Sequence, residues 1–165
     1  MKALILYRSH YGNTRQVAEG IAGELTSLGH VAAVQDLRRR LPDMKDVDLI
    51  FIGAPTRMAR VTRRALRVLK RLRKLGAARK PLAVFDTFGP VPTEPEKLEK
   101  GRKWLEPGAA GLMQEAARTL GLNVYPETLR CEVKAMKGPL ADGALEKAVV
   151  FVRDFVSAAG QSRAG

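Results

Sequence analysis

The sequence has few residues of the kinds that cross-link a chain, hold a metal or span a membrane. It contains a single cysteine, Cys131, which excludes an internal disulfide and any zinc site built on several cysteines. One thiol is typical of a protein from the reducing cytoplasm. No apolar run reaches the roughly 18 residues that a membrane-spanning helix needs, so we expect no integral membrane association. Met1–Tyr7 runs straight into Arg8 and is too short to predict a signal peptide.

Acidic side chains are missing from one long stretch of the chain. The net charge of the protein is +12, yet residues 1–48 have a net charge of only +1 and residues 86–165 of zero. Residues 49–85 contain eleven Lys and Arg and no Asp or Glu, so they hold nearly the whole excess. Such a charge is typical of nucleic-acid binding. Its basic helix, within 57–80, lacks the interleaved aromatic residues on which bases would stack, however, and we expect no DNA partner.

Length and composition predict one folded domain. A chain of 165 residues buries about 70% of its unfolded surface, so it needs neither a disulfide nor a structural metal. Its 45% hydrophobic and 28% charged residues are in the range of globular proteins and exclude overall disorder. We expect the domain to cover residues 1–159 and residues 160–165 to form a flexible C-terminal tail.

Short apolar runs alternate with amphipathic segments along the chain. Strands are expected at Lys2–Tyr7, Val31–Val34, Val47–Ile52 and Pro81–Phe85, with a fifth formed by Leu122–Tyr125 and Thr128–Val133. Helices are expected from Asn13 to Leu28, over 61–75, from Pro107 to Leu120 and over Ala144–Val156. Arg38–Asp46 is expected to be a loop or short helix, and Pro95–Lys100 a small helix within a long connection. This alternation predicts a parallel, doubly wound sheet.

Three polar loops follow the carboxyl ends of predicted strands. They are Arg8–Thr14, Gly53–Ala59 and Asp86–Pro92. In open parallel sheets, ligands bind beyond the carboxyl ends of the strands, where the strand order reverses. We therefore expect the three loops to form one binding site.

The first loop, Ser9-His10-Tyr11-Gly12-Asn13-Thr14, has the chemistry of a phosphate site. It leads into a predicted helix, whose first N–H groups and partial positive charge attract anions. Hydroxyl groups can donate to phosphate oxygens, and a glycine lets the backbone come close. The sequence contains neither G-x-G-x-x-G after its first strand nor G-x-x-x-x-G-K-[ST]. Taken alone, the loop could also be an ordinary polar turn.

Together the loops resemble those of the flavodoxin family. The first is similar to the S/T-x-T-G-x-T loop that binds the FMN phosphate, with Tyr11 in place of Thr as in flavodiiron proteins and flavodoxin-like quinone reductases. Gly53-Ala54-Pro55-Thr56-Arg57 resembles the G-[ST]-P-T loop beside the flavin ring. Phe85-Asp86-Thr87-Phe88-Gly89-Pro90 resembles F-G-S-Y-G-W, with Asp86 and Pro90 as departures. The likeness extends from Lys2 to about Ala158.

The resemblance implies an α/β fold with a five-stranded parallel sheet in the order 2-1-3-4-5, helices on both faces, and FMN as cofactor. It implies that hydroxyl and amide groups of the first loop hold the phosphate, that backbone groups of the other two contact the ring, and that Phe88 stacks on it, with Tyr11 and Trp104 as alternatives. The residues implied in cofactor binding are Ser9, His10, Tyr11, Gly12, Asn13, Thr14, Pro55, Thr56, Arg57, Met58, Asp86, Thr87, Phe88 and Gly89.

Three functions remain open from the sequence. The favoured one is an FMN-dependent electron carrier; the second is an NAD(P)H:quinone-type oxidoreductase, for which Tyr11 and the Pro55-Thr56-Arg57 segment argue. The third is a flavin-free protein that binds nucleic acid or anionic membrane. Basic segment 57–80 is either a solvated helix face or a docking surface for an acidic redox partner, such as a ferredoxin or a reductase. Its cations should also make the flavin potential less negative.

Overall fold

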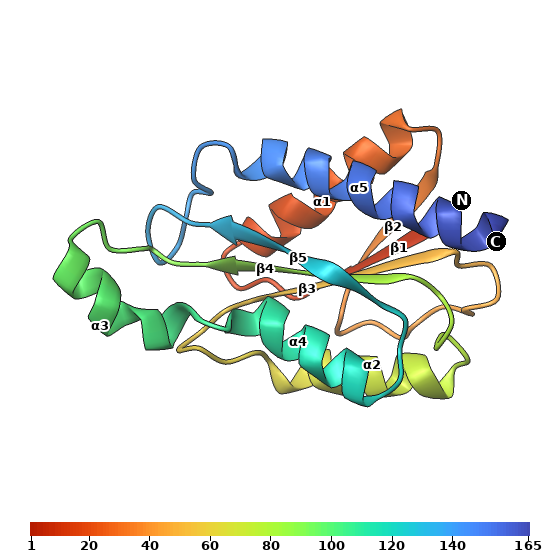
Figure 1. The fold of residues 1–165 in the computed structure, drawn as a ribbon, viewed down its shortest axis with the longest axis horizontal. Helices are drawn as coiled ribbons and strands as arrows, with labels where there is room; N and C mark the ends of the chain where they lie inside the picture. The colour runs from red at the N-terminus through yellow and green to blue at the C-terminus, as the bar shows by residue number, and fades with distance from the viewer.

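The computed structural model describes all residues, Met1–Gly165, and its centre is a five-stranded parallel sheet in the order β2-β1-β3-β4-β5 (Figure 1). The predicted fold class and strand order are confirmed. The strands are β1 (Lys2–Tyr7), β2 (Val31–Asp36), β3 (Leu49–Pro55), β4 (Leu82–Phe88) and β5 (Val124–Glu132). The helices are α1 (Asn13–Ser27), α2 (Arg63–Lys74), α3 (Pro95–Leu105), α4 (Gly108–Thr119) and α5 (Ala144–Ala164).

The sheet separates two apolar cores. Helices α1 and α5 cover one face, and α2 and α4 cover the other (Figure 1). In β1, Leu4 and Leu6 pack into the core under α2 and α4, whereas Ala3 and Ile5 pack into the core under α1 and α5. Because central strands are covered on both faces, they are apolar without alternation, as the sequence of β3 shows.

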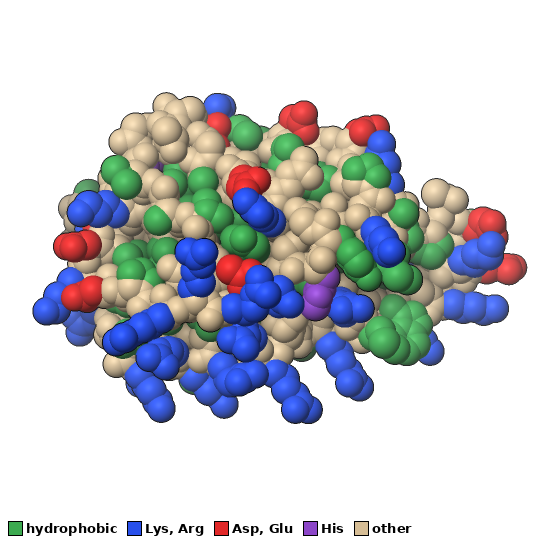
Figure 2. Space-filling model, turned by 180° about the vertical axis from the view of Figure 1, so that it is seen from behind, with side chains coloured by type: hydrophobic (Ala, Val, Ile, Leu, Met, Phe, Trp, Pro, Cys, Tyr) green, Lys and Arg blue, Asp and Glu red, His purple; other side chains and the backbone are tan.

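Helix α2 carries much of the positive charge outward. Thr62 caps it by accepting a hydrogen bond from the Ala65 N–H through its Oγ1, at 3.3 Å. Its apolar face is buried against the core and consists of Ala65, Val68, Leu69 and Leu72. The cations between them face solvent, and Lys and Arg side chains crowd the lower edge of the molecule in Figure 2, the side on which Figure 1 shows α2.

Helix α3 projects beyond the carboxyl edge of the sheet and buries none of its residues (Figure 1). The two chain termini lie together at the opposite edge (Figure 1). None of the helices combines the length and apolar character needed to cross a membrane.

Several expected boundaries are wrong; β2 and β3, for example, end at Asp36 and Pro55 and not at Val34 and Ile52. Strand β4 continues through Phe88, so Asp86–Phe88 belongs to the sheet and not to a loop, because a hydrogen-bond network described below satisfies the buried Asp86. The last helix does not end at Val156 but runs to Ala164, where Arg163 forms an ion pair with Asp48 at 2.8 Å. The small helix expected at Pro95–Lys100 is present and extends to Leu105.

Candidate functional site

The three loops meet at the carboxyl edge of the sheet around a cavity of about 310 Å³. Ligand sites in proteins typically measure about 300–1,000 Å³. Twelve of the fourteen residues implied in cofactor binding line this cavity: Ser9, His10, Tyr11, Asn13, Thr14, Pro55, Thr56, Arg57, Met58, Thr87, Phe88 and Gly89. The structure thus brings together side chains from three separate parts of the chain, as predicted.

At one end of the cavity, helix α1 begins without a side-chain cap. Gly12, at the N-cap, has a φ of 93°, a left-handed conformation that glycine adopts without strain. Its N–H donates to Ser9 Oγ at 3.0 Å, which closes the loop, and no acidic residue lies in the first helical turn. The N–H groups of that turn therefore have no internal partner, which is the arrangement that binds an anion.

Two buried threonines form the inner wall beside this end. Thr14 Oγ1 and Thr87 Oγ1 lie 2.8 Å apart, and both side chains are nearly fully buried. One hydroxyl donates to the other, so one proton of the pair remains free to donate into the cavity. This bond connects α1 to β4 directly below the loop that ends in Gly12.

The loop after β3 forms a tight turn at the cavity rim. Arg57 and Arg60 exchange two backbone hydrogen bonds, and the residues between them, Met58 and Ala59, have φ values of 49° and 61°. Left-handed backbone costs non-glycine residues about 1–2 kcal/mol each, so surrounding contacts must hold the turn. One such contact is the Ala59 N–H, which donates to the Trp104 carbonyl oxygen of α3 at 3.0 Å.

Asp86 does not line the cavity, contrary to its implied contact with the ring. It is fully buried in β4, and its carboxylate accepts hydrogen bonds from Arg130 Nε at 3.0 Å and from Thr56 Oγ1 at 2.8 Å. It also accepts from the Ala110 N–H at 3.1 Å, at the start of α4. Arg130 in turn donates to the Leu105 carbonyl oxygen at 2.8 Å. Asp86 therefore positions the walls of the site from behind.

This network also changes the expected roles of two neighbours. The Thr56 hydroxyl donates to Asp86 and accepts from the Ala109 N–H at 2.7 Å, so mainly the backbone of this loop is available to a ligand. Phe88 is half-buried at the end of β4, and the Arg130 guanidinium lies 4.2 Å from its ring centre. One face of the best stacking candidate is thus already covered.

The other aromatic candidates lie at the rim. Tyr11 lines the cavity and is 47% exposed. Trp104 is equally exposed and lines an adjoining hollow of about 370 Å³ between α3 and the loops. The two hollows share Thr56, Met58 and Gly89, which makes the site an elongated, open depression.

The groups with shifted pKa values include His10 and Cys131. Partial burial, and then the cations Arg57 and Arg8, lower the pKa of His10, so its imidazole is neutral near pH 7. Burial raises the pKa of Cys131 to about 12, which makes this thiol unreactive at neutral pH. No group of three or more His, Cys, Asp or Glu side chains is arranged to hold a metal ion.

Sequence reasoning missed two residues of the cavity wall, Val133 and Met136. Both belong to the connection between β5 and α5. Since β5 lies beside β4 and runs parallel to it, this connection leaves the sheet at the same edge as the other three loops. Ligands bind beyond the carboxyl ends of parallel strands, so the β5–α5 connection could have been included with the three loops. Its sequence, however, resembles no motif that binds a phosphate or a flavin ring.

Comparisons with known proteins agree with this architecture. The model of a family described as "Flavodoxin domain" matches residues 4–125. Among solved structures, an archaeal flavodoxin has a TM-score of 0.75 and 22% identity, over 97% of this chain and 99% of its own. Flavodoxin 1 of Bacillus cereus has a TM-score of 0.70 and 21% identity, over 95% and 98%.

A third structure, the rubredoxin oxygen:oxidoreductase of Desulfovibrio gigas, aligns with 99% of this chain over 37% of its own length, with a TM-score of 0.68 and 17% identity. No curated protein matches the sequence significantly. The family match covers most of the chain and includes all three site loops in full. This match, together with the strand order of the sheet and the position of the cavity, shows that the chain belongs to the flavodoxin family.

Proposed function

We propose that the protein binds FMN and carries electrons between redox partners. The observation that supports this most directly is the start of α1, which has neither a side-chain cap nor an acidic residue and opens into a cavity completed by the other two loops. A phosphate placed there would accept hydrogen bonds from the first helical turn and from the hydroxyl pair.

The residues present fit such a cofactor along the length of the depression. Ser9, Tyr11, Asn13 and Thr14 surround the phosphate end, and the backbone of 55–58 and of 87–89 borders the part where a ring would lie. FMN supplies the redox chemistry when bound, and the chain fixes its position and electrostatics. The neutral imidazole of His10 adds no second positive charge beside Arg57.

The openness of the site supports transfer between proteins. Met58 is 72% exposed and Tyr11 47% exposed, so a ring held between these loops would reach the surface. An exposed edge allows electrons to pass to a docked protein without a bound small substrate. The single buried thiol, Cys131, is compatible with the reducing cytoplasm as the place of this activity.

FMN affinity tests this proposal. Removing a hydroxyl that binds an anion costs about 1.5–3 kcal/mol, so Thr14→Val should weaken FMN binding by roughly 10- to 100-fold. Thr26→Val, on an exposed turn of the same helix, is the matched control and should bind FMN like the wild type. Riboflavin, which lacks the phosphate, should bind weakly to all three. Flavin fluorescence titration gives the constants, and a protein that binds neither compound contradicts the proposal.

For the electron partner we propose an acidic redox protein, such as a ferredoxin or a reductase, docked against segment 57–80. This segment contains no acidic residue, and none of its cations takes part in an ion pair of the structure. A positive surface without internal carboxylate partners attracts negatively charged proteins and accelerates their association.

The hollow beside Trp104 favours one alternative, an NAD(P)H:quinone-type oxidoreductase. At about 370 Å³, lined by Pro90, Pro92, Trp104 and Leu105 among others, it could hold a planar acceptor next to a flavin. Steady consumption of NADH or NADPH by the FMN-loaded protein with a soluble quinone would favour this activity over electron transfer between proteins. Absence of turnover would leave the carrier function.

A further inference from the structure

The connection between β2 and β3, residues 37–48, contains no helix, whereas every other connection of the sheet contains at least one. Its residues Leu37, Leu41, Met44 and Val47 fold back over the core that α2 and α4 cover. The edge strand β2 receives less cover. Ala33 is exposed although it pairs in register with Leu4, a buried residue of that same core. A slot therefore remains open beside α2.

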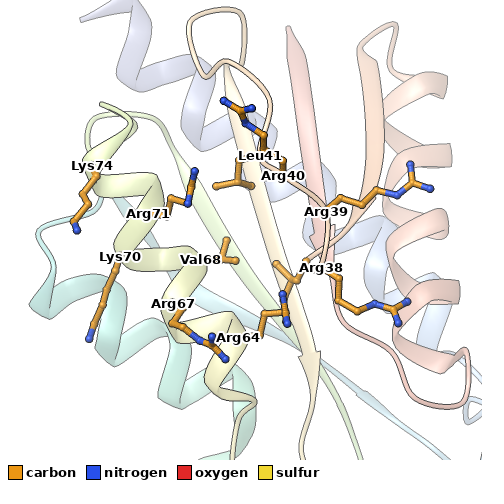
Figure 3. Close-up of a pocket in the computed structure, with 11 residues that line it drawn as sticks. Arg38, Arg39, Arg40, Leu41, Arg64, Arg67, Val68, Lys70, Arg71 and Lys74 are labelled. Carbon is orange, nitrogen blue, oxygen red and sulfur yellow. The ribbon is translucent and has the colours of Figure 1, made fainter.

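A hollow of about 580 Å³ occupies this slot, and basic residues line it from both sides. In Figure 3 Arg64 and Arg71 of α2 extend toward the slot, whereas the Arg38 and Arg39 side chains extend away from α2. We call it the cationic groove, and it is lined by Leu37, Arg38, Arg39, Arg40, Leu41, Arg64, Arg67, Val68, Lys70, Arg71 and Lys74. The first wall is the start of the β2–β3 connection, and the second is α2. No acidic residue lines it, and only Arg38 has a carboxylate partner, Asp36 at 3.0 Å.

The floor of the groove offers little apolar surface. Leu41 and Val68 lie between the two walls in Figure 3. They are only 9% and 8% exposed, and Leu37 is 3% exposed. The groove also lacks aromatic residues on which a base could stack. An occupant is therefore recognised by its negative charges.

We propose that the cationic groove docks an acidic α-helix of a protein partner. Along α2, Arg64, Arg67 and Arg71 follow one another at intervals of three and four residues, about 4.5 and 6 Å of helix rise. An α-helix with Glu or Asp at i, i+3, i+4 and i+7 presents carboxylates at the same intervals. Each strand of a nucleic-acid duplex instead carries a charge about every 3.4 Å along its axis.

This proposal refines the docking surface proposed above. It adds Arg38, Arg39 and Arg40, which lie outside segment 57–80, and it gives the partner a secondary structure. Only the redox role of the partner rests on the proposed function. Because the interface is charged and has little apolar area, the complex should be transient and salt-dependent, as electron-transfer complexes are.

An Ala-rich peptide of about 20 residues, with Glu at i, i+3, i+4 and i+7 and a fluorescent label, is the probe. A second peptide has the same composition with its Glu residues distributed around the helix. Fluorescence anisotropy with the flavin-free protein should show tighter binding of the first peptide, lost at high salt. The flavin-free form makes the result independent of FMN binding. Tripolyphosphate and duplex DNA are the competing ligands.

Charge-reversal variants in each wall distinguish binding of the peptide in the groove from non-specific binding to the basic surface. Arg67→Glu/Arg71→Glu and Arg39→Glu/Arg40→Glu should each weaken binding of the first peptide by on the order of tenfold. Lys100→Glu/Arg118→Glu, an equal change of charge on exposed residues outside the groove, is the control and should change it little.

Four results would overturn the proposal. They are equal binding of the two peptides, an unaffected variant of the β2–β3 wall, a control that weakens binding as much as the groove variants, or tighter binding of DNA or tripolyphosphate than of the peptide.

Discussion

Arg57 is the cation whose position has the most direct electrostatic consequences. It lines the cavity, and its charge helps to lower the pKa of His10. A fixed positive charge disfavours protonation of a neighbouring imidazole and, by the same sign, favours a reduced, anionic flavin. At about 6 Å and an effective dielectric constant near 20, one charge contributes roughly 3 kcal/mol, on the order of 100 mV for a one-electron step. Solvent screening makes this an upper bound.

We therefore expect Arg57→Gln to have two effects of opposite sign. The pKa of His10 should rise toward its ordinary value, because the imidazolium loses a repelling neighbour, and the potential of bound FMN should become more negative. NMR titration of the His10 ring and a spectroscopic redox titration measure the two. Arg79→Gln, on an exposed residue of the same basic segment away from the cavity, is the control. An unchanged His10 pKa would contradict the electrostatic argument.

At the scale of elements, one buried carboxylate holds the site together. Asp86 of β4 connects Arg130 of β5, the loop after β3 through Thr56, and the start of α4 through Ala110. The same Arg130 covers the Phe88 ring and holds the end of α3 at Leu105. The carboxylate thus connects β4, β5, the loop after β3 and the start of α4, and through Arg130 the end of α3.

Asp86→Asn should lower the free energy of unfolding by about 3–5 kcal/mol, because it leaves the partly buried Arg130 without its carboxylate. Urea unfolding measures the loss, and the exposed Asp154→Asn is the matched control. In the double variant Asp86→Asn/Arg130→Gln, the two costs should be less than additive, because the second change removes the unpaired charge. Additive costs would show that the pair does not interact.

The sequence was sufficient to predict the elements whose formation depends on local residue patterns. It was insufficient where contacts between residues far apart in the chain determine the structure. The loops after β1 and β3 were predicted because parallel strands bring their carboxyl ends to one edge. The end of β4 was missed because the buried Asp86 is stable within a strand only through partners far away in the sequence, among them Arg130, 44 positions away. The first wall of the cationic groove was missed because Arg38–Arg40 meets α2 only in the folded chain.

At the scale of the whole molecule, the charge is asymmetric. The cations of 49–85 have no acidic neighbour in sequence, and the cationic groove that they border has basic residues on both sides and no acidic residue. Electrostatic steering then depends on the sign of the partner's charge.

Electron transfer from a reduced, negatively charged donor, such as a plant-type ferredoxin, to the FMN-loaded protein should slow by at least tenfold between low and physiological ionic strength. Reduction of positively charged cytochrome c by the reduced FMN-loaded protein should be slow at low salt and should not slow further as salt is added. Stopped-flow rates at several salt concentrations give both trends. Equal trends for the two partners would show that the asymmetry does not guide association.

The positions of the chain ends have a practical consequence. Both termini lie at the edge of the sheet opposite the cavity, and Arg163 anchors the end of α5 to Asp48 near the start of β3. A tag or tether attached at either end therefore points away from the open depression. On an electrode or a fusion scaffold, the molecule can be immobilised by its tail with the depression proposed to bind FMN facing the solution.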